Sequence, residues 1–500
     1  MKALVLNPPF MPMYSRQSRS PAVTKSSTLY YPYYLAYCTG VLELEEGLEV
    51  RLIDAPAAGW DRERLYCFVR EFKPDLLVCD TTTGSIYNDV EIAAGIKDIS
   101  GAFTVLVGTH VSAVTEETMG ISPSIDSIAR REYDFTIRDL AVLMRDAGTD
   151  FRSKLAAVRG LSFRTEQGGM IHNPDRPFIE DLDSLPFVSE VYKKHLSEHL
   201  ERYFYGANLN PIVTILSGRG CPYECAYCVQ PQTFSGHRYR LRSVKNVVDE
   251  MQYIAREFPN AREIFIEDDT LTVNRKRAKE LSREIIDRGL KITWSANSRA
   301  DCDYETLALM KKAGCRLLCV GFESGDQTVL DNIGKKIRLE QIYAFMEAAK
   351  KARILIHGCF LVGNRGETGE TLRKTLALAL KINPDTAQFY PIMVYPGTSA
   401  FKWAKENGYL RTGDYRDWLT AGGLHNSVVT TPGITDEELV NFCDGARRAF
   451  YLRPSYILSK LVQLITRPEE RGRILRASKT FVKYVFRDSR KSEKEACACR

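Results

Sequence analysis

The stretch Gly220-Cys221-Pro222-Tyr223-Glu224-Cys225-Ala226-Tyr227-Cys228 spaces three cysteines as Cys-x-x-x-Cys-x-x-Cys. It follows directly on a β-rich run, residues 211–217. A four-iron cluster has four iron corners and normally takes four cysteine thiolates. Three cysteines in one loop therefore leave one iron open to a small molecule. We expect Cys221, Cys225 and Cys228 to hold a 4Fe-4S cluster.

A zinc site or three free thiols are the alternatives for this loop. A structural zinc site is closed by four ligands. The nearest histidine, His237, lies in a basic loop, and no second Cys-x-x-Cys pair accompanies it. The spacing therefore favours the cluster.

The cysteine spacing resembles that of the radical S-adenosylmethionine (radical SAM) enzymes. These carry Cys-x-x-x-Cys-x-aromatic-Cys after the first barrel strand, and Tyr227 fills the aromatic position here. In that family the amino acid end of SAM binds the open iron, and an electron from the cluster cleaves SAM to methionine and a 5'-deoxyadenosyl radical. The resemblance implies that the cofactors supply the reactivity, while the protein positions and shields them.

Six strand candidates occupy the region from residue 196 to 395, each followed by helical patterning. They are residues 211–217, 262–268, 291–296, 316–322, 353–362 and 386–392. Six βα units predict a partial (β/α)6 barrel, because a full barrel has eight and the following sequence does not supply two more. Functional groups of such barrels lie at the C-terminal ends of the strands.

Polar residues and glycines follow these strand ends, where the resemblance places SAM. The residues that it assigns to SAM binding are Tyr227, Asp268, Asn297, Arg299, Glu323, Ser324, Gly358 and Gly363. The sequence departs from the family pattern at residues 268–269, which are Asp-Asp instead of glycines, and at residues 363–366, which are Gly-Asn-Arg-Gly instead of Gly-Leu-Pro-Gly. For any one of these residues, a helix cap or a strand-end salt bridge is the alternative role.

Residues 1–147 alternate short β-rich runs with helix-length segments, which predicts a parallel doubly wound sheet. Ligands of such sheets bind at the carboxyl ends of the strands. Here those ends are residues 7–9, 81–84 and 108–110. Gly-x-Gly-x-x-Gly is absent after the first strand, which argues against a dinucleotide.

This segment resembles the cobalamin-binding domain that precedes the barrel in one branch of the radical SAM enzymes. The matching pieces are residues 7–9 (NPP), 31–37 (YPYYLAY) and 107–113 (VGTHVSA). The resemblance implies cobalamin contacts from Asn7, Pro8, Thr81, Thr82, Gly108, Thr109 and His110. The Asp-x-His-x-x-Gly signature is absent, so no histidine from it can be the lower axial ligand. His110 either contacts the corrin or satisfies a loop backbone, and Thr81 to Thr83 either line the site or cap the next helix.

Two further regions complete the organisation. Residues 148–195 predict a hairpin that turns at Gly168-Gly169 and an extended linker. Residues 396–500 predict a helical C-terminal domain with a basic tail. Residues 451–500 hold 13 Lys and Arg against 5 Asp and Glu, in a chain of net charge +6.

Residues 457–486 mix apolar and basic residues at near-helical spacing. They predict a helix on an anionic membrane surface or an ordinary surface helix packed on the barrel, and we favour the packed helix. Specific nucleic-acid binding is not expected, because the tail lacks regular aromatic interleaving.

The cysteines and the apolar runs predict a cytoplasmic protein. Thirteen cysteines are diluted over 500 residues, which indicates buried thiols in a reducing compartment. Cys315 and Cys319 fit core thiols on one strand face, and Cys497 and Cys499 lie in the charged tail. No run approaches the roughly 20 apolar residues of a membrane span, and the N-terminus fits a strand rather than a signal peptide. Peripheral membrane contact through the basic tail is the alternative location.

The resemblance covers nearly the whole chain and includes residues 451–457 (YLRPSYI). The group that it indicates contains hopanoid-associated radical SAM proteins and the anaerobic magnesium-protoporphyrin cyclase. It implies a methyltransferase that acts on an unactivated carbon through the 5'-deoxyadenosyl radical and methylcobalamin. A cyclase, ring-contracting or oxidising enzyme that uses cobalamin without methyl transfer is one alternative, and a non-catalytic metal-bound scaffold or nucleic-acid binder is another. The implied partners are a small-molecule or lipid-like substrate and an electron donor such as flavodoxin or ferredoxin.

Overall fold

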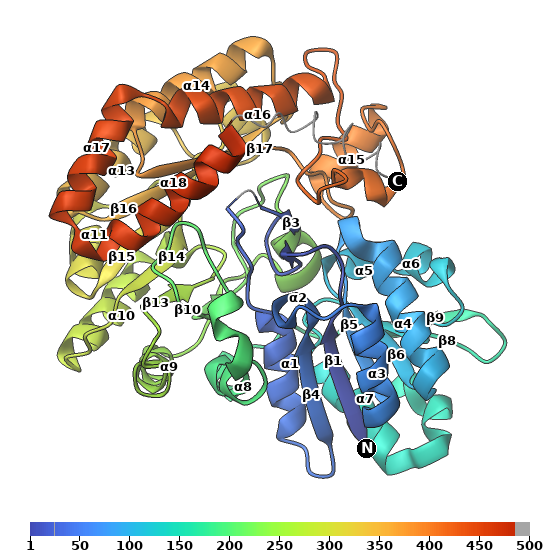
Figure 1. Cartoon of the computed structure of the whole chain (residues 1–500). Coiled ribbons are helices and arrows are strands. Elements are labelled where there is room, and N and C mark those ends of the chain that lie inside the picture. The colour runs from blue at the N-terminus through green and yellow to red at the C-terminus, as the bar shows by residue number, and fades with distance from the viewer. Residues whose placement is uncertain (25, 486–500) are drawn as a thin grey trace.

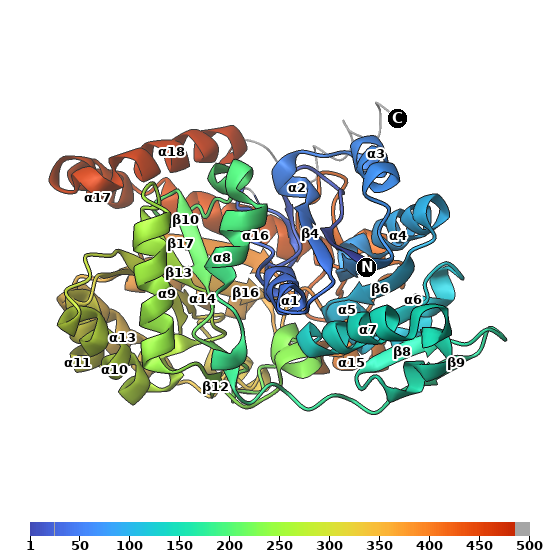
Figure 2. The ribbon, with the colours of Figure 1, turned by 90° about the horizontal axis from the view of Figure 1, so that it is seen from below.

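Two parallel β-sheets dominate the computed structural model, which describes residues 1–24 and 26–485, with side chains to residue 479. The first sheet belongs to the N-terminal third of the chain, and the second forms a partial barrel beside it (Figure 1). The C-terminal helices lie along the outer side of the barrel (Figures 1 and 2). Cys497, Cys499 and the end of the basic tail lie outside the described residues.

The first sheet has the strand order β4-β1-β5-β6-β7-β8-β9, and β4 to β7 are joined in parallel. Successive residues of β1 face opposite sides: Ala3 and Val5 pack in the core with α1 and α7, and Leu4 and Leu6 pack in the core with α3 and α4. The predicted doubly wound sheet is therefore confirmed. Its strands are β1 (Lys2–Asn7), β4 (Glu49–Asp54), β5 (Leu76–Asp80), β6 (Phe103–Val107) and β7 (Ser127–Ala129); its helices are α1 (Tyr33–Glu43), α2 (Ala55–Ala58), α3 (Arg62–Phe72), α4 (Ile86–Ser100), α5 (Thr109–Ala113), α6 (Thr115–Ile121) and α7 (Asp134–Ala147).

Between β1 and α1 the chain makes a long excursion over the carboxyl ends of these strands. It contains a two-stranded hairpin, β2 (Tyr14–Ser15) and β3 (Ala22–Val23). The hairpin expected within residues 148–195 forms β8 (Leu161–Arg164) and β9 (Met170–His172), and β8 pairs antiparallel with β7. That hairpin therefore extends the first sheet.

The second sheet has the order β10-β13-β14-β15-β16-β17, with every pair parallel, as the six predicted βα units require. The third strand begins at Trp294, three residues later than expected, and its register shifts between Trp294 and Ser295. The strands are β10 (Ile212–Ile215), β13 (Glu263–Ile266), β14 (Trp294–Ser298), β15 (Cys315–Gly321), β16 (Leu355–Val362) and β17 (Thr386–Pro391); the helices are α9 (Val244–Glu257), α10 (Arg275–Asp287), α11 (Tyr304–Lys312), α12 (Gln327–Asn332), α13 (Leu339–Ala352) and α14 (Gly369–Ile382).

The C-terminal region is helical, as predicted, and it protects the edge of the barrel. It consists of α15 (Ser399–Glu406), α16 (Asp436–Tyr451), α17 (Pro454–Thr466) and α18 (Arg471–Val485). The Tyr451 hydroxyl donates to Ala387 O at 2.8 Å and accepts from Ala387 N at 2.9 Å. Because β17 is an edge strand, these bonds occupy backbone groups that would otherwise be open to another strand. Among the described helices, none is long and apolar enough to span a bilayer.

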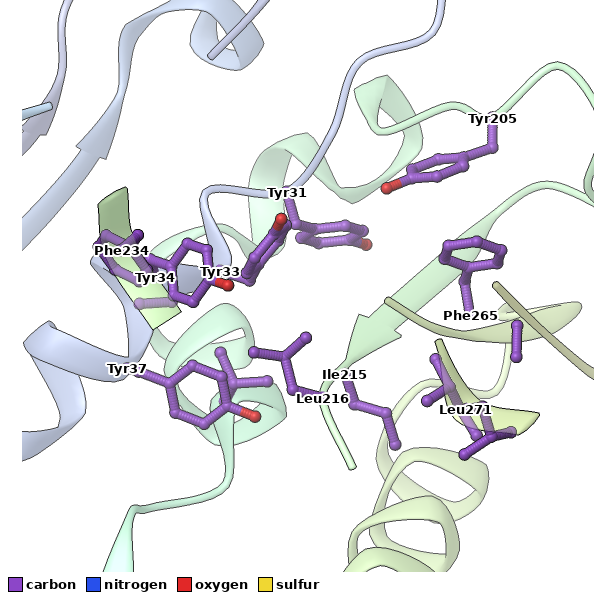
Figure 3. Packing of buried hydrophobic residues seen from close by; sticks show 14 of the residues in the cluster. Tyr31, Tyr33, Tyr34, Tyr37, Tyr205, Ile215, Leu216, Phe234, Phe265 and Leu271 are labelled. Carbon is purple, nitrogen blue, oxygen red and sulfur yellow. The ribbon is translucent and has the colours of Figure 1, made fainter. Parts of the chain in front are cut away.

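Aromatic side chains fasten the first sheet to the barrel. Tyr31, two residues before α1, stacks on Tyr203 with ring centroids 3.8 Å apart and donates its hydroxyl to Ile212 O of β10 at 2.7 Å. Tyr34 packs on Phe234 at 4.5 Å. Figure 3 shows these tyrosines from the N-terminal segment facing residues of the barrel. The two sheets therefore share one hydrophobic core.

Two buried ion pairs cross the same boundary beside α7. Arg240 donates to both carboxylate oxygens of Glu132, at 2.6 and 2.7 Å, and Arg219 donates to Asp134 at 2.7 Å. These side chains are at most 4% exposed. Removing one partner of such a pair leaves a desolvated charge without compensation.

We expect Glu132→Gln to lower the free energy of unfolding by about 3 kcal/mol, because it leaves the Arg240 guanidinium buried without its counter-charge. Urea unfolding followed by circular dichroism measures the change. Glu180 pairs with Arg238 at the surface, where both side chains are 66% exposed, so Glu180→Gln should cost less than about 1 kcal/mol. Equal losses for the two variants would contradict a special role for the buried pair.

Candidate active site

A cavity of ≈ 200 Å³ opens at the C-terminal ends of the barrel strands. All three cysteines of the opening motif line it, as do four of the residues assigned to SAM: Tyr227, Asn297, Arg299 and Glu323. Residues from the loop after β10 and from the ends of β14 and β15 therefore meet in one place, as the parallel arrangement of a βα barrel requires.

The cysteine loop is held by backbone contacts. Gly220 has φ +90°, and a Cβ atom there would lie 2.2 Å from Arg238 O, so only glycine fits before Cys221. The Gln232 side-chain amide donates to the carbonyls of Cys228, Cys225 and Ala226 at 2.8, 3.2 and 3.3 Å. These contacts fix the path of the chain between the first and last cysteines.

Burial favours the protonated form of the Cys221 and Cys228 thiols. It raises the pKa of Cys221 to about 11 and that of Cys228 well above its usual range. Within the described residues, no three His, Cys, Asp or Glu side chains converge on a point that could hold a single metal ion. Ligands of a cluster bind separate irons and need not converge in this way. Three soft donors around one cavity therefore suit a cluster better than a lone ion.

A buried carboxylate and a lysine face the cysteines across the cavity. Lys335 donates to Glu323 Oε1 at 2.7 Å, and the Tyr227 hydroxyl donates to the same oxygen at 2.8 Å. Glu323 has φ +65°, a strained conformation for this residue, and its Oε2 is buried without a hydrogen-bond partner. Strain and an unsatisfied acceptor at one side chain are typical of a ligand site.

Lys335 was not identified from the sequence. Burial alone would lower its pKa, but the charge of Glu323, its hydrogen bond and the nearby Cys225 together outweigh burial and raise the pKa, so the lysine is charged. It lies in the loop after α12, which no strand-end pattern marks. Nearby, the Arg299 guanidinium lies 3.6 Å from the centre of the Tyr223 ring and donates to Lys335 O. The cavity thus carries two cations on the wall that also holds Glu323.

The side chain of Asp268, which was assigned to SAM binding, lies away from the cavity. Its side chain is fully buried and accepts from Ser217 N at 2.6 Å, Gly218 N at 3.1 Å and the Tyr239 hydroxyl at 2.5 Å. It fixes the chain that leaves β10 and does not line the cavity. The next residue, Asp269, lines it instead. Neighbouring residues in an extended chain point in opposite directions, so the carboxylate of this turn that lines the cavity is Asp269 and not Asp268.

Three other assigned residues are placed behind the cavity wall. Ser324 is buried against the Thr375 hydroxyl at 3.2 Å. A Cβ atom at Gly358 would meet Phe322 at 3.1 Å, and one at Gly363, where φ is +94°, would meet Leu439 at 2.7 Å. Packing crowds Gly358, packing and a positive φ favour glycine at 363, and none of the three residues lines the cavity.

Arg19 reaches the cavity from the N-terminal domain and was also missed. Its Nη2 donates to Asp268 O at 2.8 Å and Glu267 O at 3.0 Å, and it lies 3.7 Å from Asp269 Oδ1. Burial raises the pKa of Glu267 to about 7, and Arg19 opposes that shift. The contact joins residues 248 positions apart, which no local pattern could indicate.

A second cavity, of ≈ 20 Å³, lies at the carboxyl edge of the first sheet. Thr81, Thr82, Gly108 and Thr109 line it, as the resemblance implied. The same cavity is closed on its other side by residues of the cysteine loop, and Val229, Gln230 and Tyr395 line both cavities. The two predicted cofactor sites are therefore separated by one shared wall.

Asn7, Pro8 and His110 do not line this second cavity. The Asn7 side chain donates to Asp54 Oδ1 at 2.8 Å and accepts from Arg16 Nη1 at 2.9 Å, and Pro8 O accepts from the same guanidinium. His110 Nδ1 lies 3.0 Å from the Thr83 hydroxyl, and burial lowers the pKa of the imidazole to about 3. His110 is therefore a neutral residue that orders the loop rather than a cavity wall.

A corrin does not fit here with the chain as it stands. A cavity of ≈ 20 Å³ holds a few waters, and the remaining space is filled by the excursion between β1 and α1. Gln17 donates to Asp80 Oδ2 at 2.5 Å, and Arg16 is fully buried in an ion pair with Asp89 at 2.6 Å. The hydroxyls and the glycine of this edge suit corrin amides in chemical type, but Arg16 to Pro21 would have to move to admit the ring.

The raised pKa of Glu267 predicts a pH-dependent stability. The pKa of Glu267 is 4.5 in the unfolded chain and about 7 in the folded protein. Between these two pH values the folded protein holds a proton that the unfolded chain has lost. The free energy of unfolding therefore falls as the pH rises. Glu267→Gln removes this loss. We expect the stability of the variant relative to the native protein to rise by roughly 3 kcal/mol between pH 4.5 and 8, measured by urea unfolding. Glu198→Gln, at an exposed position, should show no such trend. If the stability difference between Glu267→Gln and the native protein did not change with pH, the raised pKa of Glu267 would be contradicted.

Comparison with known proteins agrees with this geometry. Residues 215–379 match the model of the Radical SAM superfamily. An uncharacterized methyltransferase of Pyrococcus horikoshii, PH0819, is 32% identical over 434 residues, which cover 86% of this chain and 90% of that protein. The anaerobic magnesium-protoporphyrin IX monomethyl ester cyclase of Rubrivivax gelatinosus is 28% identical over 376 residues, which cover 74% of this chain and 66% of that protein.

Among solved structures, the radical SAM methyltransferase TsrM of Kitasatospora setae, with cobalamin and a [4Fe-4S] cluster bound, is similar with a TM-score of 0.69. The match covers 91% of this chain and 89% of that one at 19% identity. It therefore shows that the two proteins share a fold. With the cysteine triad at the mouth of a six-stranded βα barrel and a close relative matched over nearly its whole length, the chain belongs to the radical SAM superfamily.

Proposed function

We propose that the protein is a cobalamin-dependent radical SAM methyltransferase that acts on an unactivated carbon. The observation that carries this proposal is the convergence of Cys221, Cys225 and Cys228 with the Glu323–Lys335 pair around one cavity. Two relatives that match most of this chain are named methyltransferases, which supports methyl transfer as the reaction.

The residues of the cavity divide into cluster ligands and groups that match the charges of SAM. The three cysteines would hold the 4Fe-4S cluster. Lys335 and Arg299 suit a carboxylate, and Asp269 and the unsatisfied oxygen of Glu323 suit an ammonium group. When bound, cluster and SAM together supply the radical chemistry that removes hydrogen from an unactivated carbon. The chain itself would hold the amino acid end of SAM through these opposite charges.

Part of the cavity wall is apolar or aromatic. Leu361, Met393, Tyr390 and Tyr395 line it, and each belongs to the end of β16 or to the chain around β17. An apolar wall helps to protect a reactive centre from side reactions and suits an apolar part of the substrate. A small-molecule or lipid-like substrate fits this lining, and an electron donor such as flavodoxin or ferredoxin would supply the cluster.

Cobalamin is assigned to the carboxyl edge of the first sheet. Support comes from the fold shared with TsrM, whose structure contains cobalamin, and from the threonines and glycine at this edge. To admit the ring there, Arg16 to Pro21 would have to move. A cytoplasmic location agrees with the single buried thiols of Cys38, Cys79 and Cys315.

We expect Cys225→Ala to lose the iron-sulfur absorption and the cleavage of SAM, because one of three cluster ligands is gone. Iron and sulfide content after anaerobic reconstitution measures this. Cys359→Ala is a matched control, since Cys359 lines the same cavity outside the triad, and it should keep the cluster. A full cluster in Cys225→Ala would refute the ligand assignment.

Methyl transfer predicts that a deuterated methyl group supplied on SAM appears in a product. The reduced protein with cobalamin is incubated with small-molecule and lipid extracts, and products are screened by mass spectrometry. A cyclase, as some relatives are named, would form 5'-deoxyadenosine without passing on the label. That outcome would replace the methyltransferase proposal with the cyclase.

A further inference from the structure

The C-terminal helices carry an unusual concentration of exposed apolar side chains. Seven of the twelve large hydrophobic side chains that are exposed in the described part of the chain lie between residues 452 and 475. They are Leu452, Ile457, Leu458, Leu461, Val462, Ile465 and Leu475, and their exposed fractions run from 46% to 75%. Five of them recur on α17 at helical spacing and form one continuous face, which we call the α17 apolar face (Ile457, Leu458, Leu461, Val462, Ile465).

The other side of α17 is polar and attaches the helix to the barrel. The Tyr456 hydroxyl donates to Asp385 O at 2.9 Å, and Lys460 Nζ lies 3.9 Å from Asp385 Oδ1. Just before the helix, Arg453 donates to Asn383 Oδ1 at 3.0 Å. No residue of α17 is buried. The helix is therefore packed on the barrel, as favoured from the sequence, but through its polar side, whereas an ordinary surface helix turns its apolar stripe inward.

Positive charge borders the α17 apolar face. Arg471 donates to Leu464 O at 2.7 Å, so its guanidinium lies at the end of α17 beside Ile465. Arg476 and Lys479 are exposed on α18 near Leu475. Residues 454–467 contain no Asp or Glu. Of the two acids between residues 452 and 479, Glu470 is buried against Arg316 at 2.7 Å, which leaves only Glu469 exposed.

We propose that the α17 apolar face is a docking surface for an anionic lipid bilayer. Apolar side chains on one side of a helix enter the boundary between headgroups and acyl chains, while Arg or Lys beside them meets the lipid phosphates. Helix α17 lies at the outer margin of the molecule in both views, where a flat surface can reach it (Figures 1 and 2). This contact adds a location to the proposed function and does not depend on it.

Other occupants are less suited to this surface. Residues 487–500 contain no Leu, Ile, Val, Met, Phe, Tyr or Trp, so this stretch is not suited to cover the α17 apolar face. A second copy joined through the same face would bring two cationic borders together, and like charges repel. An anionic bilayer offers acyl chains to the α17 apolar face and phosphates to the positive charges beside it.

Sedimentation of the full-length protein with vesicles tests the proposal. One arm uses phosphatidylcholine alone, and the other adds phosphatidylglycerol. We expect binding to the anionic vesicles that weakens as salt is raised, and little binding to the neutral ones. The double variant L461Q/I465Q should bind about tenfold less, because two exposed apolar side chains are lost. The matched control is Leu44→Gln, a 69% exposed leucine at the end of α1, which should bind like the native protein.

Three outcomes would overturn the proposal. The first is equal binding to both kinds of vesicle, and the second is an unchanged partition of L461Q/I465Q. The third is a concentration-dependent dimer that L461Q/I465Q abolishes in analytical ultracentrifugation, since a second copy would then be the occupant. Both substituted positions are exposed, and thermal unfolding of the variants checks that the fold is kept.

Discussion

The docking of the N-terminal sheet against the barrel is the contact on which the functional site depends. Tyr31 and its neighbours supply the apolar area, and the Arg219 and Arg240 ion pairs fix the register across it. Aromatic residues bury much surface with few rotamers, while buried ion pairs tolerate little displacement. Together they turn the carboxyl edges of both sheets toward each other, so that the two cavities share a wall.

This placement also explains the concentration of buried charge between the sheets. Arg19 crosses from one domain to the other and lies among Glu267, Asp269 and the carbonyl of Asp268. Burial alone makes each of these charges costly, and the elevated pKa of Glu267 is one sign of that cost. Buried charges of both signs suit a site for the amino acid end of SAM, because the ammonium and carboxylate of the ligand would compensate them.

The C-terminal region illustrates how one stretch of sequence can serve two surfaces. Tyr451 and Tyr456 attach α16 and α17 to the strand edge and to the loop before it. The apolar residues of α17 are thereby left facing outward. An amphipathic pattern specifies that a helix has an apolar side, but it does not specify what that side faces.

The sequence alone determined the alternation of strands and helices, the six barrel strands and the cysteine triad, because these are local patterns of burial and spacing. It also determined which turns carry polar groups. Only the tertiary structure decided that Asp269 and not Asp268 faces the cavity, since one residue of rotation reverses a side chain. The tertiary structure also brought Arg19 and Lys335 to the site and filled the carboxyl edge of the first sheet with Arg16 to Pro21. These outcomes depend on contacts between segments far apart in the chain, whose geometry is set by the packing of whole sheets.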